Sequence, residues 1–162
     1  MMIKLYKRQP DGRLAYHETW VRGKHITEHW GQVGTQGESR VHPIQSGDER
    51  YELERILAMA REGGFERVDR DRHRRLVVEY VVAGMGTVAD LDKRVRLENR
   101  LNETLGWTGL GHCDGGSIGS GTMEVCCFVV DFETAKSVVE RDLTSTEFSN
   151  FSRIYDEDAD GE

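Results

Sequence analysis

Strand-forming segments alternate with turns over the first 45 residues, a pattern typical of an antiparallel meander. The turns fall at Gln9–Gly12 and Arg22–Lys24, where proline and glycine favour turn geometry. The predicted strands are Ile3–Lys7, Leu14–Val21, His25–Gln32 and Glu38–Ile44. Leucine, isoleucine and alanine then recur at helical spacing, which predicts a helix over Glu49–Arg61 that ends at Gly63. Because this helix must bury its apolar stripe against the sheet, the first domain is predicted to be a small sheet with one packed helix.

The second part of the chain has a different order of predicted elements. Strands are expected at Leu76–Val82, within Gly109–Gly121, at Met123–Val130 and at Phe148–Tyr155, with helices over Asp90–Leu105 and Thr134–Leu143. The order strand–helix–strand–strand–helix–strand is that of a ferredoxin-like sandwich. The predicted class is therefore α+β, with a ferredoxin-like α/β domain after the first sheet.

The charged, apolar-free segment Asp69–Arg75 marks the predicted domain boundary. The domains are then residues 1–70 and 71–155, followed by 156–162. Five of these last seven residues are acidic, which predicts a disordered acidic tail.

Composition limits the class of protein. The chain has 162 residues, of which 37% are hydrophobic, and no apolar run is long enough to cross a membrane. The N-terminus lacks the apolar region of a signal peptide, and three cysteines do not make a disulfide framework. We therefore expect a cytoplasmic protein without membrane contact.

Net charge is divided unevenly along the chain. The first 70 residues carry 12 basic and 11 acidic side chains, whereas the remainder carry 10 and 18. Neither part has the positive excess of a protein that coats duplex DNA. Any nucleic-acid binding should therefore be local, or directed at an unusual structure such as an end.

Several kinds of chemistry lack their sequence signature. The glycine-rich segment Gly109–Gly121 leads into a strand and lacks the Gly-Lys-Ser/Thr ending of a phosphate loop, so a hairpin is favoured over a small-ligand site. The pairs His112–Cys113 and Cys126–Cys127 lack the spacing of zinc ligands, and neighbouring strand residues point to opposite faces. No serine elbow or Cys–His pairing is evident. We expect no metal, no cofactor and no enzymatic activity.

The most specific string runs from Glu28 to Gly37, with Trp30 followed by glycines at every third position, Gly31, Gly34 and Gly37. Glycine in a strand marks a bulge, or a place where another backbone or a ligand comes close. Trp30 therefore lies beside residues that cannot shield it. It is either a stacking platform or a core tryptophan at a hairpin corner.

This string resembles the motif of the WGR domain, a module found in poly(ADP-ribose) polymerases and in small bacterial proteins. The resemblance covers residues 2–70 and includes Ile3–Leu5, Tyr16–Trp20, Trp30–Gly37 and Gly63–Phe65. The family's name implies arginine at the third motif position, where this chain has Gln32. In the polymerases the module contacts DNA near a break and touches neighbouring domains. The resemblance implies either role for Trp30, while the catalytic domain of those enzymes would not fit in this chain.

The favoured function is recognition of nucleic acid, such as DNA ends or nicks. The candidate nucleic-acid-binding residues are Trp30, Gly31, Gln32, Lys4, Arg22, Lys24 and Arg40. The aromatic ring would stack on a base or sugar, and the basic side chains would meet phosphates. The alternative is a protein–protein interaction adaptor, in which the C-terminal domain supplies the specific contact.

Overall fold

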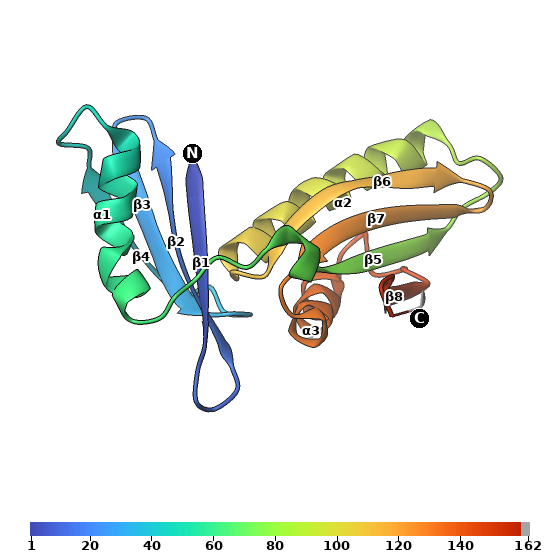
Figure 1. The fold of residues 1–162 in the computed structure, drawn as a ribbon. Helices are drawn as coiled ribbons and strands as arrows, with labels where there is room; N and C mark the ends of the chain where they lie inside the picture. Colours follow the sequence, from blue (N-terminus) through green and yellow to red (C-terminus); the bar gives the residue numbers. More distant parts are fainter. Residues whose placement is uncertain (160–162) are drawn as a thin grey trace. The chain divides into compact units, whose positions relative to one another are not determined.

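The computed structural model describes residues 1–159, which form two four-stranded antiparallel sheets and three α-helices (Figure 1). The α+β class predicted from the sequence is confirmed. The chain divides into two compact units, Met1–Asp69 and a second unit that begins at Arg70. Each unit has its own sheet and its own core.

The first unit is a meander in which each strand pairs with the next one in the sequence. Its elements are β1 (Met2–Arg8), β2 (Leu14–Arg22), β3 (His25–Gln32), β4 (Glu38–Pro43) and the helix α1 (Glu49–Glu62). The hairpin between β2 and β3 turns at Gly23, whose positive φ of 60° is accessible to glycine without strain. The strands start and end within one or two residues of their predicted bounds.

Helix α1 packs against β1 and β2 on one face of the first sheet. Leu53, Leu57 and Ala60 of the helix are buried against Ile3, Leu5 and Ile26 of the strands. The helix begins where the Asp48 carboxylate accepts a hydrogen bond from the Tyr51 amide, 3.1 Å away. This packing confirms that a helix covers one face of the sheet.

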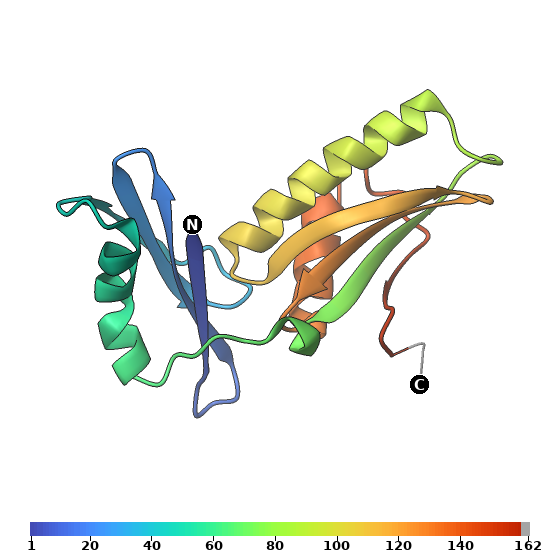
Figure 2. The same cartoon turned by 45° about the horizontal axis from the view of Figure 1, so that its top comes forward.

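The second unit has strands in the spatial order β6-β7-β5-β8, all antiparallel to their neighbours (Figure 2). Its elements are the 3₁₀ turn η1 (Arg70–Arg72), β5 (Arg74–Val81), α2 (Val88–Trp107), β6 (Gly111–Gly119), β7 (Thr122–Val129), α3 (Phe132–Leu143) and β8 (Arg153–Asp156). The glycine-rich segment forms β6 and the turn into β7, which is a hairpin. Across residues 1–159, none of the helices combines the length and apolar character that crossing a lipid bilayer requires.

Alternating burial along β7 shows which face of the second sheet the helices cover. Met123, Val125, Cys127 and Val129 are buried, whereas the residues between them are only half-buried. Helices α2 and α3 contact each other and supply apolar side chains to this covered face, namely Leu97, Leu101, Leu105, Ala135, Val139 and Leu143. Neither α2 nor α3 covers the opposite face of the sheet.

Two details of the predicted boundaries are wrong. Arg74 and Arg75 belong to β5 rather than to a linker, because each pairs with a residue of β7. The last strand begins at Arg153 and not at Phe148. Phe148 is instead buried, and its carbonyl oxygen accepts a hydrogen bond from the Tyr80 hydroxyl at 2.7 Å.

The prediction of a disordered tail is wrong for residues 156–159. Asp156 ends β8, and its carboxylate lies 2.7 Å from the Arg74 guanidinium. The Asp158 carboxylate lies 2.8 Å from the Arg75 guanidinium and accepts from the Arg75 amide. The two arginines thus fix acidic residues that local composition alone assigns to a solvated run. The rest of the predicted tail, 160–162, lies outside the described residues.

We expect limited proteolysis to separate the two units. Arg67, Arg70 and Arg72 are exposed and precede the first strand of the second unit, so trypsin should cleave there first. Mass spectrometry should identify two fragments that meet within residues 67–72, and circular dichroism should show that both stay folded. Early cleavage inside β5, or unfolding of either fragment, would contradict two independent cores.

Candidate nucleic-acid interface

Trp30 lies near the end of β3, on the same sheet face as helix α1, and its side chain is half-buried. The His17 ring from β2 stacks on the indole, with centroids 5.9 Å apart and planes inclined by 24°. From β4, the Arg40 guanidinium lies 5.8 Å from the indole centroid. Trp30 is therefore neither a bare platform nor a core residue: side chains from both neighbouring strands contact it.

Beside Trp30, two histidines share one carboxylate. His17 Nε2 lies 2.9 Å from Glu28 Oε1, and His42 Nε2 lies 2.7 Å from Glu28 Oε2. Partial burial raises the pKa of Glu28, but the hydrogen bonds from His42 and His17 outweigh it, so the pKa is lowered overall. The charged carboxylate in turn fixes the His17 ring against which Trp30 stacks.

Gln32 occupies the position at which the resembled family has arginine, and a neighbouring arginine reaches it. Arg13 Nη1 donates a hydrogen bond to Gln32 Oε1 at 3.3 Å, and two thirds of the Arg13 side chain is exposed. A guanidinium therefore lies beside the motif although the motif itself has none. Sequence reasoning missed Arg13. The register of the hairpin would have found it, since Arg13 precedes by two residues the Ala15 that pairs with Gln32.

The remaining predicted basic residues lie elsewhere. Lys4 is on the opposite sheet face, where its ammonium lies 3.8 Å from the Glu18 carboxylate. Arg22 and Lys24 belong to the β2–β3 hairpin at the other end of β3, about 17 Å from Trp30 along the strand. The structure thus brings together Trp30, Gln32 and Arg40 but not the other three cations.

The glycines of the motif serve the folding of the loop that follows β3. A side chain on Gly37 would collide with the Trp30 carbonyl, and Gly37 has a positive φ of 61°. A Cβ at Gly31 would lie 2.8 Å from the Gly37 Cα. The missing side chains therefore let the loop 33–37 fold back on the end of β3, on the face away from Trp30.

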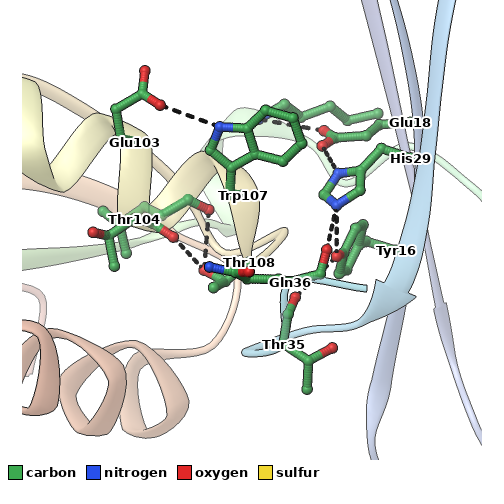
Figure 3. Close-up of polar contacts among 11 residues, drawn as sticks. Tyr16, Glu18, His29, Thr35, Gln36, Glu103, Thr104, Trp107 and Thr108 are labelled. Carbon is green, nitrogen blue, oxygen red and sulfur yellow. Dashed lines mark hydrogen bonds and ion pairs between the residues drawn. The ribbon is translucent and has the colours of Figure 1, made fainter. Parts of the chain in front are cut away.

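That loop is held by a buried polar network (Figure 3). His29 Nδ1 lies 2.8 Å from Glu18 Oε1, and His29 Nε2 lies 2.6 Å from the Gln36 carbonyl oxygen. The Tyr16 hydroxyl donates to the Thr35 carbonyl oxygen at 2.9 Å and lies 3.1 Å from His29 Nε2. His29 and Glu18 are 1% and 3% exposed, so this network is part of the core.

The hydrogen bonds pair the polar groups of the network. Both nitrogens of His29 face oxygen atoms, Nδ1 the Glu18 carboxylate and Nε2 the Gln36 carbonyl. Burial, together with the negative charge of Glu18, raises the pKa of the Tyr16 hydroxyl above its ordinary value. Tyr16 therefore stays protonated and remains a donor to the loop. Hydrogen bonds to charged groups of this kind are among the stronger ones in proteins.

The uncovered face of the second sheet is the other aromatic surface. Phe128 of β7 and Tyr155 of β8 lie on it, both half-buried. The guanidinium of Arg70 lies 5.8 Å from the Phe128 centroid, and that of Arg153 lies 3.8 Å from the Tyr155 centroid. This surface combines aromatic rings with cations, and no sequence motif predicted it.

Two carboxyl groups oppose each other on that face. Glu79 of β5 is directly opposite Glu124 of β7. Arg153 binds Glu79 through two nitrogens, each 3.2 Å from a carboxylate oxygen, and the pKa of Glu79 is lowered chiefly by this contact. Burial, and then the hydrogen bond with Glu79, raise the pKa of Glu124. One partner is therefore charged, and the other binds a proton more readily.

Of the cysteine and histidine pairs of the second unit, only one residue of each pair comes together. Cys113 is opposite Cys127, whereas His112 is opposite Phe128 and stacks on its ring at 5.8 Å. Within residues 1–159, no cluster of three or more His, Cys, Asp or Glu side chains has an arrangement that would hold a metal ion.

We expect Trp30→Ala to destabilise the protein by about 2 kcal/mol, roughly half the loss for a fully buried tryptophan. Trp30→Phe should cost less, because a phenyl ring still packs on His17. Met59→Ala serves as a matched control, since Met59 is 83% exposed in the same unit. Urea denaturation followed by circular dichroism measures all three. A loss as small as that of the control would show that the contacts with His17 and Arg40 contribute nothing.

The Glu79–Glu124 pair predicts a pH-dependent effect. Because the pKa of Glu124 is raised in the folded state, its contribution to stability is present at low pH and is lost as the pH rises through the folded pKa. Glu124→Gln should therefore match the wild type at about pH 4 and be more stable at about pH 8.

Glu79→Gln should have the opposite effect, because the lowered pKa of Glu79 means that its charge stabilises the fold at high pH. Thermal melts at both pH values compare the two variants. Equal melting of Glu124→Gln and wild type at high pH would argue against the raised pKa.

Comparison with known proteins found no matching family model, no similar curated protein and no similar solved structure. Any function assigned to this chain therefore rests on the geometry of its own residues.

Proposed function

We propose that the protein is a non-enzymatic nucleic-acid-binding module that recognises DNA ends or nicks through its first unit. The observation that carries the proposal is Trp30, half-buried near the end of β3 with the His17 ring and the Arg40 guanidinium beside its indole. An indole held in a fixed orientation beside a cation can stack on an unpaired base or on the terminal sugar of a broken strand.

Two guanidinium groups lie on or next to the motif and would supply contacts to phosphate. Arg40 lies beside the indole, and Arg13 reaches the neighbouring Gln32. Arginine is suited to phosphate oxygens because its planar fork donates two parallel hydrogen bonds. Two such contacts next to one stacking ring suit a short, local feature of DNA better than a long duplex.

We infer further that the first unit has a WGR-like fold and the second a ferredoxin-like fold. The first inference is supported by a four-stranded meander, a helix packed on it and the Trp-Gly string at the end of β3. The second is supported by the element order β5-α2-β6-β7-α3-β8 and the spatial order β6-β7-β5-β8. DNA binding by the first unit is the role that the WGR resemblance implies.

A protein–protein adaptor is the second candidate function, and one observation favours it. The uncovered face of the second sheet presents Phe128 and Tyr155 next to arginines, and aromatic residues and arginine are enriched at protein interfaces. In that case Trp30 stabilises the first unit without binding a ligand. An apolar contact of this kind would depend weakly on salt, in contrast to phosphate contacts.

Titration with labelled blunt, nicked and single-stranded DNA at two salt concentrations tests the DNA-binding proposal. We expect Trp30→Ala to weaken binding about ten- to hundredfold, because one stacked base contributes roughly 1–3 kcal/mol. Arg13→Gln and Arg40→Gln should each weaken binding and lower the salt dependence by about one phosphate contact.

Matched controls are available at the far end of the same sheet. Arg22→Gln and Lys24→Gln remove the same charge at the β2–β3 hairpin, and should leave DNA affinity nearly unchanged. An equal loss for all four charge variants would indicate non-specific attraction. Unaltered binding by a folded Trp30→Ala protein would reject the interface and favour the adaptor.

A further inference from the structure

Two cysteines of the second unit lie side by side on neighbouring strands. Cys113 of β6 is directly opposite Cys127 of β7, and their sulfur atoms are 2.7 Å apart. Cys127 is fully buried, whereas Cys113 is half-buried. Both thiols are free, and the two side chains point to the same face of the sheet.

The backbone already has the spacing that a disulfide requires. Directly opposed residues of an antiparallel pair have Cα atoms about 4.5–5.5 Å apart, within the range of roughly 4.4–6.8 Å found across disulfides. The strand is also held in place at this point, because the Cys113 amide donates to the Asn102 Oδ1 of helix α2 at 2.7 Å. A bond between the sulfur atoms therefore needs only a small side-chain rotation.

The third cysteine does not share this position. Cys126 is next to Cys127 on β7, and successive side chains of a strand point to opposite faces. Its partner across β5 is Val77. Cys126 is half-buried like Cys113, so it serves as an internal control with similar access to solvent.

We propose that Cys113 and Cys127 form an oxidation site that closes to an intramolecular disulfide when the protein meets a peroxide. The oxidant is of the hydroperoxide class. It reaches the half-buried Cys113 first, and the Cys113 thiolate attacks one peroxide oxygen. The O–O bond breaks, Cys113 becomes a sulfenic acid, and the leaving oxygen departs as water after taking a proton.

The second step joins the two sulfur atoms. Cys127 loses its proton and its sulfur attacks the sulfenic sulfur, so the S–O bond breaks and hydroxide leaves as a second water. Two thiols and one hydrogen peroxide thus give one disulfide and two waters. The two sulfur atoms together lose two electrons, and these electrons reduce the two peroxide oxygens to water. The hydrogen bond with Cys113, together with burial, raises the pKa of Cys127, which suits it to the second step rather than the first.

The disulfide would add a covalent bond between two strands that are otherwise joined by backbone hydrogen bonds. It joins the edge strand β6 to β7 immediately before the register irregularity between Cys113 and Gly116. A disulfide between Cys113 and Cys127 closes the loop of chain between these two residues and so restricts the unfolded chain. The oxidised unit should therefore melt about 5 °C higher or more than the reduced one.

The test uses the full chain, reduced, desalted and then treated with hydrogen peroxide. Thiols are counted by maleimide labelling in denaturant, followed by mass spectrometry under non-reducing conditions. The reduced protein should take three labels, one for each of its cysteines. The oxidised protein should take one label, on Cys126, and a peptide should link Cys113 to Cys127.

Variants make the assignment specific. Cys126→Ser should still form the disulfide and lose both of its remaining labels, whereas Cys113→Ser and Cys127→Ser should form no intramolecular bond. The wild-type peptide map decides the matter even if Cys127→Ser fails to fold. Three labels retained after peroxide, or a bond that includes Cys126, would overturn the proposal.

Discussion

The buried contact between His29 and Glu18 is the constraint on which the first unit depends. A buried polar side chain is costly unless it is hydrogen-bonded, and here Glu18 and the Gln36 carbonyl give each ring nitrogen of His29 a partner. The loop after β3 is therefore attached to the core by its backbone carbonyl groups, although Thr35, Gln36 and Gly37 are themselves exposed. The glycines at 31 and 37 follow from the same contact, since a side chain at either position would push the loop away from His29.

The pleat of β3 separates this structural role from the proposed binding role. His29 and Gly31 point to the network face, whereas Trp30 and Gln32 point to the face that bears α1. The network fixes the backbone of β3, and the fixed backbone sets the orientation of the indole. A single short segment thus has a structural role on one face of the sheet and the proposed binding role on the other. This explains why a glycine directly follows the large aromatic Trp30.

The sequence predicted the helices and strands, but not the side-chain contacts between residues that are distant in the sequence. Turn chemistry and periodicity located the meander, α1 and the order of elements in the second unit, because these depend on local residue preferences. The contacts of Asp156 and Asp158 with Arg74 and Arg75 join residues more than 80 positions apart, so a local acidic run was assigned to a tail. The Cys113–Cys127 pair was hidden for a related reason. The register of β6 against β7 shifts between Cys113 and Gly116, and no pattern in the sequence predicts this irregularity. The residue that lies opposite Cys113 could therefore not be deduced from the sequence.

The long-range ion pairs also bear on how DNA would be bound. Arg74 and Arg75 are close to Arg70 and Arg72 in sequence and together suggest a basic patch, yet carboxylates of the C-terminal strand region neutralise the first two. Within the first unit, Arg40 lies beside Trp30, and Arg13 lies beside Gln32 and 3.7 Å from the Asp11 carboxylate. Binding through about two phosphate contacts should depend on salt far less steeply than the six to ten contacts of a duplex-binding protein. Most of the affinity would then come from the stacked ring, and this is the balance expected for recognition of an exposed base or sugar at a strand end.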